Sequence, residues 1–121
     1  MTVWLAGHYD WWKATVAGAA VTDWVDQYDL SDGNVGRATF LGGSPYVGDN
    51  MQKYIDQSPI TESKNIKAPT LILANIGDPR VPVTQSYKLY HSLIPAHNAT
   101  DPITKMERDK MWVNWMNTYL K

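Results

Sequence analysis

The sequence predicts an α/β fold in which a few parallel strands are flanked by helices. Two short apolar runs, residues 13–19 and residues 69–75, have the composition of strands that are buried on both faces, as in parallel sheets. Segments of helical character lie before, between and after these runs. The alternation of helices with buried strands indicates the α/β class.

Five segments are expected to be helical. Residues 1–8 suit one or two turns, and residues 22–30 form a polar, aromatic segment. In residues 49–57 the side chains of Met51, Tyr54 and Ile55 share one face. The remaining helices are expected over residues 83–93 and 102–120, each with proline near its first turn.

The segments between these elements are expected to be loops. Residues 31–48 are rich in glycine, asparagine and serine, which favours irregular structure. Residues 58–60 should end the preceding helix, and residues 61–67 form a polar connection to the second strand. A further loop is expected over residues 94–98, before the final helix.

Composition excludes several classes of function. The chain has 121 residues and a net charge of −1 with both signs scattered, which argues against electrostatic binding of nucleic acid. It has no cysteine and no apolar run long enough to span a membrane, and its three histidines lack metal-ligand spacing. We therefore expect no metal, cofactor, nucleic-acid partner or membrane span. The first residues lack a signal peptide, so a cytoplasmic location is the default expectation.

One turn carries the clearest chemical signal. The second apolar run is followed by Gly77-Asp78-Pro79-Arg80-Val81-Pro82, which holds a carboxylate beyond the carboxyl end of a predicted strand. His97 follows later, and acid before base is the order of these residues in α/β-hydrolase triads. A turn aspartate before proline and a loop histidine are the structural alternatives.

These residues resemble the carboxyl-terminal part of the catalytic domain of prolyl oligopeptidase family serine peptidases. The resemblance extends over nearly the whole chain, in residues 12–24, 58–60, 66–82 and 83–93. It implies an α/β-hydrolase fold and substrates that are peptides or esters. Asp78 matches the triad acid, and His97 matches the base because residues 96–102 resemble the loop that leads into the last helix. In such a triad the acid orients the imidazole, which deprotonates the serine.

Two departures from the family pattern limit this expectation. The chain has no Gly-x-Ser-x-Gly elbow, and the strand that precedes the elbow in the family is also missing. Only residues 94–96 separate the predicted helix from His97, where the family has its last strand. We therefore expect residues 1–121 to form a single partial α/β-hydrolase domain, the carboxyl-terminal half, which is inactive alone.

Two other functions stay open. Ser44 lies in Gly42-Gly43-Ser44-Pro45-Tyr46, which resembles half an elbow, although a turn serine is the favoured interpretation. In a minimal esterase, Ser44, or failing that Ser86 or Ser58, would serve as nucleophile. In a non-catalytic module, open strand edges and aromatic surface would pair in a homo-oligomer that completes the fold.

Overall fold

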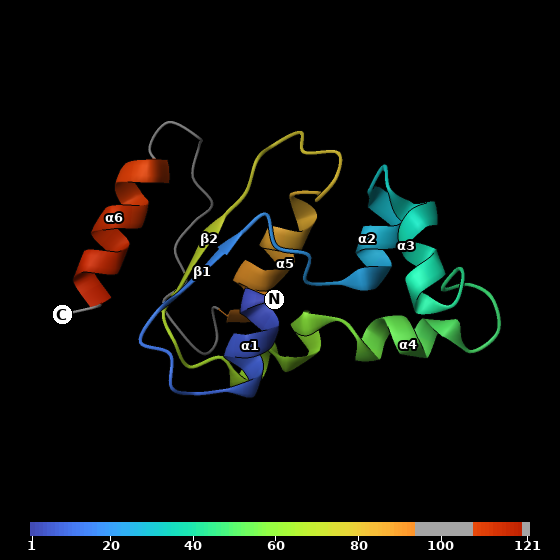
Figure 1. Ribbon diagram of the computed structural model, residues 1–121, viewed down its shortest axis with the longest axis horizontal. Coiled ribbons are helices and arrows are strands. Elements are labelled where there is room, and N and C mark those ends of the chain that lie inside the picture. The colour runs from blue at the N-terminus through green and yellow to red at the C-terminus, as the bar shows by residue number, and fades with distance from the viewer. Residues whose placement is uncertain (94–107, 120–121) are drawn as a thin grey trace.

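Two parallel strands form the centre of the computed structural model, which describes residues 1–93 and 108–119 (Figure 1). Strand β1 (Thr15–Gly18) pairs with β2 (Thr70–Leu73), with Thr15 opposite Thr70 and Gly18 opposite Leu73. All four residues of β2 are buried. The strands predicted over residues 13–19 and 69–75 are confirmed, as is their parallel direction.

Helices surround these strands in the described parts of the chain. Their bounds are α1 (Thr2–His8), α2 (Trp24–Leu30), α3 (Asn34–Leu41), α4 (Asn50–Asp56), the 3₁₀ helix η1 (Pro59–Asn65), α5 (Thr84–Leu93) and α6 (Arg108–Tyr119). The helices predicted over residues 1–8, 22–30, 49–57 and 83–93 are confirmed. The final helix is confirmed over α6, whereas the predicted loop 94–98 and residues 102–107 lie outside the described residues.

The loop predicted over residues 31–48 is wrong in part, because α3 occupies the middle of this segment. Helix α3 ends at Gly42, whose φ of 87° is in the left-handed region where glycine is strongly favoured. The N–H of Gly43 donates to the carbonyl of Ala38 at 2.8 Å and closes the last turn. A glycine that suggests a loop by composition therefore acts here as the end of a helix.

The polar connection predicted over residues 61–67 is also more regular than expected. It contains most of η1, which begins at Pro59, a residue suited to a first helical turn. Helix α1 approaches η1 so closely that a Cβ on Gly7 would lie 2.8 Å from Cβ of Glu62. The absence of a side chain at Gly7 therefore permits this helix contact.

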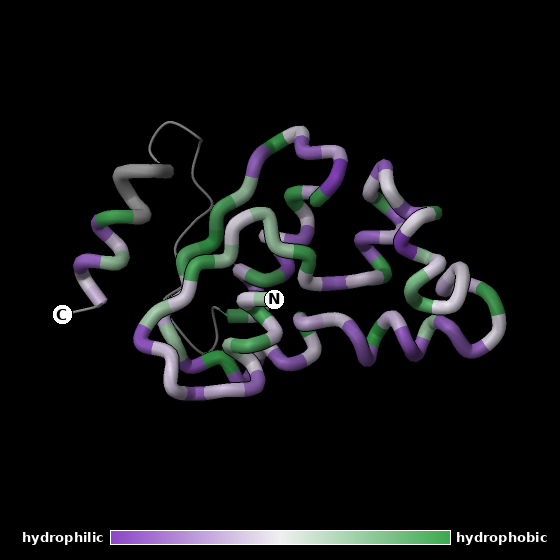
Figure 2. The backbone as a smooth tube through the Cα atoms, in the orientation of Figure 1, coloured by the Kyte–Doolittle hydropathy of each residue, from purple (hydrophilic) through white to green (hydrophobic). Residues whose placement is uncertain are grey.

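The hydrophobic core lies between the strands and helices α1, η1 and α5. Its buried members are Val3, Ala6, Ala17, Ile66, Ile72, Leu89 and Leu93. Figure 2 shows β2 as an almost continuous hydrophobic run at the centre of the molecule. Burial of this apolar surface is the main favourable term in the stability of the segment.

A buried glutamine joins α5 to the segment that follows β1. Oε1 of Gln85 accepts hydrogen bonds from the backbone N–H groups of Thr22 at 2.9 Å and Asp23 at 2.8 Å. Its Nε2 donates to the carbonyl of Asp23 at 2.8 Å, and the Thr22 hydroxyl also donates to Oε1 at 2.9 Å. Thr22 and Gln85 are fully buried, so these bonds replace water that cannot reach the groups.

We expect Gln85→Met to lower the free energy of unfolding by about 3–5 kcal/mol, because it leaves several buried backbone groups without partners. Urea denaturation followed by circular dichroism measures this loss. The matched control is Gln57→Met, at the exposed end of α4, which should change stability by less than about 0.5 kcal/mol. Equal losses in the two variants would contradict the structural role of Gln85.

Candidate functional site

Asp78 lies in the turn that connects β2 to α5. This turn, residues 77–82, is called the acid loop below, and it follows the carboxyl end of β2 as the sequence predicts. Gly77 has a φ of 83°, which a glycine adopts without steric cost. The N–H of Asp78 donates to the carbonyl of Asn75 at 3.4 Å. Asp78 is partly exposed, at the edge where α/β sheets place functional side chains.

Two backbone groups hold one oxygen of this carboxylate. Oδ1 of Asp78 accepts hydrogen bonds from the N–H groups of Arg80 at 2.8 Å and Val81 at 3.0 Å. The hydrogen bonds from Val81 and Arg80 lower the pKa of Asp78 below its ordinary value of 3.8, with a smaller contribution from the Arg80 charge. Asp78 is therefore ionised at neutral pH.

The second oxygen of Asp78, Oδ2, takes no hydrogen bond from the residues that the structure describes. One oxygen is thus fixed by the backbone while the other can accept a further donor. An acid that orients an imidazole needs an acceptor oxygen of this kind. His97, the predicted base, falls within residues 94–107 and lies outside the described residues.

Ser44 lies in the turn between α3 and α4. Its Oγ accepts a hydrogen bond from the N–H of Tyr46 at 3.2 Å, and its carbonyl accepts one from Nδ2 of Asn50 at 3.3 Å. It follows a helix, whereas an elbow serine follows a strand. No hydrogen bond among the described residues joins Ser44 to Asp78.

The other two serine candidates are buried. Ser58 donates to the carbonyl of Tyr54 at 2.6 Å and accepts from the N–H of Trp24 at 2.8 Å, so its hydroxyl joins α2 to α4. Ser86 lies on α5 and is 3% exposed. The structure places both hydroxyls inside the packed region of the segment.

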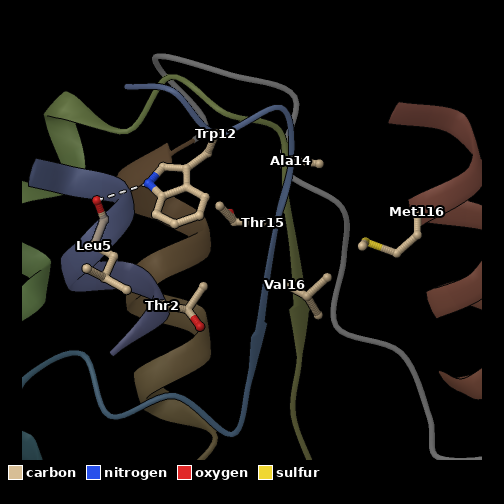
Figure 3. A pocket seen from close by; sticks show the side chains of 7 residues that line it. All are labelled: Thr2, Leu5, Trp12, Ala14, Thr15, Val16 and Met116. Atoms are coloured by element: carbon tan, nitrogen blue, oxygen red, sulfur yellow. Dashed lines mark hydrogen bonds between the residues drawn. The ribbon is translucent and has the colours of Figure 1, made fainter. Parts of the chain in front are cut away.

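An apolar groove of about 320 Å³ lies along β1, and the sequence analysis did not predict it. Figure 3 shows side chains from α1, β1 and α6 directed toward this groove. Its lining residues are Thr2, Leu5, Trp12, Ala14, Thr15, Val16 and Met116. The indole N–H of Trp12 donates to the carbonyl of Leu5 at 3.3 Å and fixes one wall. In the sequence, the signal for this groove was the group of apolar and aromatic residues near the start of the chain.

The described residues contain neither a membrane-spanning helix nor a cluster of metal ligands. None of their helices is both long and apolar enough to cross a membrane. Within residues 1–93 and 108–119, no group of three or more His, Cys, Asp or Glu side chains gathers as metal ligands would.

The pH dependence of stability tests the state of Asp78. Because its folded-state pKa is depressed, the ionised carboxylate stabilises the fold above pH 3.8, and this contribution is lost as pH falls through the folded-state pKa. We expect Asp78→Asn to be less stable than the wild type near about pH 6, with a difference that shrinks below pH 3.8. Urea unfolding over the acidic range measures both chains.

Asp49→Asn controls for the general loss of a carboxylate, because the Asp49 side chain is exposed and makes no cap hydrogen bond. A difference between wild type and Asp78→Asn that stays constant with pH would contradict the role of the backbone hydrogen bonds.

Comparison with known proteins gives a consistent result. A sequence profile of the prolyl oligopeptidase family matches residues 1–112. The uncharacterized peptidase YuxL of Bacillus subtilis (strain 168) is 29% identical over 94 residues, which cover 77% of this chain and 14% of YuxL.

Two solved structures of Pyrococcus horikoshii acylaminoacyl peptidase are similar to the whole segment. The uncomplexed form has a TM-score of 0.87 at 27% identity, over 100% of this chain and 22% of that one. The orthorhombic crystal form has a TM-score of 0.83 at 25% identity, over 98% of this chain and 22% of that one. The chain therefore spans less than a quarter of these relatives, and it is a partial α/β-hydrolase domain that belongs to the prolyl oligopeptidase family.

Proposed function

We propose that residues 1–121 are the carboxyl-terminal segment of a serine peptidase catalytic domain, which supplies the acid and the base but not the nucleophile. The observation that carries the proposal is the carboxylate of Asp78, whose Oδ1 is held by two backbone N–H groups and whose Oδ2 is open to a donor. Family membership and the peptidase relatives support peptides as the substrate class.

In this proposal Asp78 and His97 act as a pair. Oδ2 of Asp78 accepts an imidazole N–H from His97, which fixes the tautomer and stabilises the imidazolium form. The other imidazole nitrogen then takes the proton of a serine hydroxyl that lies outside this sequence. The depressed pKa of Asp78 suits this role, because the carboxylate stays charged while the imidazole gains a proton.

The absence of a Gly-x-Ser-x-Gly elbow among the 121 residues supports a lack of hydrolase activity in the isolated chain. The hydroxyl of Ser44 supports the same interpretation, since it accepts the N–H of Tyr46 within a turn that follows a helix. A minimal esterase that uses Ser44 is the alternative.

Reaction with a fluorophosphonate probe, read by mass spectrometry, tests the proposal. We expect no labelled serine in the wild-type chain, because the proposed nucleophile lies outside these 121 residues. Turnover of p-nitrophenyl acetate should be equal for wild type, Ser44→Ala and His97→Ala. Stoichiometric labelling of Ser44 that disappears in His97→Ala would overturn the proposal and establish the esterase.

A second function, self-association, is favoured by the apolar groove along β1. The described sheet has only two strands, so each keeps one edge whose outward peptide groups are not paired within the sheet. Val16 and Trp12 line the groove, and Trp11 beside them is 70% exposed. We propose that a second copy of the chain covers this face.

The mass in solution, measured by light scattering after size-exclusion chromatography, tests self-association. We expect a dimer or larger species, and Val16→Lys should shift it toward the monomer because it places a charge in the apolar groove. Val35→Lys, at a position 78% exposed on α3, is the matched control and should leave the mass unchanged. A monodisperse wild-type monomer would contradict this second proposal.

A further inference from the structure

Two successive peptide units of the acid loop make hydrogen bonds through both their N–H and their carbonyl groups. In the unit between Pro79 and Arg80, the carbonyl of Pro79 accepts the N–H of Asp32 at 2.9 Å, while the N–H of Arg80 donates to Asp78. In the unit between Arg80 and Val81, the N–H of Val81 donates to the same carboxylate oxygen. Both units therefore direct their N–H groups at the acid and their carbonyls away from it.

The carbonyl of Arg80 is the most heavily bonded group of the loop. It accepts hydrogen bonds from Nε2 of Gln27 at 2.6 Å, Oγ of Ser31 at 2.9 Å and Nη1 of Arg37 at 3.3 Å. Nη1 of Arg37 also donates to Oγ of Ser31 at 2.8 Å, so Arg37 holds the Ser31 hydroxyl in place. One carbonyl thus receives donors from α2, from α3 and from the residues between them.

Asp32 adds an ion pair to this arrangement. Its Oδ1 lies 2.8 Å from Nε of Arg80, and Nη2 of Arg80 donates to its Oδ2 at 3.4 Å. We call Gln27, Ser31, Asp32 and Arg37 the acid clamp. All four bind the main chain or side chain of the two residues that follow Asp78.

The burial of Gln27 indicates that its amide has a specific task. The side chain is fully buried, and its Oε1 has no hydrogen-bond partner among the described residues. A buried acceptor without a partner costs stability, which an apolar side chain of similar volume would avoid. The presence of glutamine is explained by the 2.6 Å bond from its Nε2 to the carbonyl of Arg80.

We propose that the acid clamp positions the triad acid: by holding the carbonyls of Pro79 and Arg80, it aims the N–H groups of Arg80 and Val81 at Oδ1 of Asp78. Because a peptide unit is planar, fixing its carbonyl also fixes the direction of its N–H. Donors on a carbonyl also polarise the peptide and strengthen its N–H as a donor. The inference rests on the proposed role of Asp78, and the clamp residues are positioning residues that do not touch substrate.

Nuclear magnetic resonance of the full chain tests the clamp without any activity assay. The variants are Ser31→Ala, Gln27→Met and their combination. Arg37→Met, at a partly exposed residue, replaces them if the variant of the buried glutamine does not fold. The readouts are amide hydrogen exchange at Arg80 and Val81, and the carboxyl carbon shift of Asp78 as a function of pH.

We expect the double variant to speed exchange of the Val81 amide about tenfold, since two donors on its peptide unit are lost. The Arg80 amide should change less, because Asp32 still holds the carbonyl of Pro79, which belongs to the same peptide unit. The pKa of Asp78 should rise toward 3.8. The urea midpoint of Gln27→Met should stay close to wild type, because the unpartnered Oε1 is removed as well.

Two matched variants separate positioning from general weakening. Ser31→Thr keeps the hydroxyl, so the amide exchange at Val81 and the pKa of Asp78 should both match the wild type. Gly33→Ala lies in the same segment, and its added methyl would meet Cδ of Arg80 at an ordinary 3.6 Å, so it should change neither readout.

The clamp is refuted if the folded double variant keeps wild-type amide exchange at Val81 and a wild-type pKa at Asp78. If the double variant does not fold, the same result in folded Arg37→Met refutes it. It is also refuted if exchange rises equally at Leu71 and Ile72 in β2. These outcomes are independent of the fluorophosphonate experiment, so failure of the clamp and failure of the proposed function are distinguishable.

Discussion

The hydrogen bonds of Gln85 are the constraint on which the rest of this structure depends. They fix Thr22 and Asp23, the residues between β1 and α2, against the first turn of α5. The Nζ of Lys88 reinforces this contact through Asp23 at 2.8 Å and Asp26 at 2.7 Å. Since α5 begins at Thr84, close to the end of the acid loop, these bonds act together with those of Ser58 and Gln27 to place α2 relative to Asp78.

The electrostatics of the acid follow from backbone geometry more than from neighbouring charges. The N–H groups of Val81 and Arg80 are the largest causes of the depressed pKa of Asp78, and the Arg80 guanidinium contributes less. That guanidinium is paired with Asp32 across a solvent-exposed surface, where ion pairs contribute little and are screened by salt. Hydrogen bonds from planar peptide units keep their direction when ionic strength changes, which suits the orienting role proposed for Asp78.

Much of the fold could be predicted from local sequence. The two strands were recognisable because short apolar runs that contain β-branched residues and are bounded by glycine, proline or turn residues are typical of buried strands. Helix α3 was missed because glycine, asparagine and serine surround it, and its end depends on the left-handed backbone of Gly42. A tertiary contact also stabilises this helix, since Arg37 within α3 binds the carbonyl of Arg80, 43 residues later in the sequence. Propensity does not report such long-range support.

The candidate site, like the fold, could be predicted from the sequence only in part. Asp78 could be proposed as the acid because the strand, the turn and the aspartate are contiguous within about ten residues. The donors to the Arg80 carbonyl could not be predicted, because Gln27 and Ser31 lie 53 and 49 residues away and carry no motif of their own. In the described parts of the chain, the hydrogen bonds to Oδ1 of Asp78 and to the carbonyl of Arg80 come from residues 27–81, and the contact of Gln85 with Thr22 lies just outside this range. Under the proposed clamp, a recombination event that exchanged the sequence before Thr22 would leave all of these contacts with Asp78 and Arg80 unchanged.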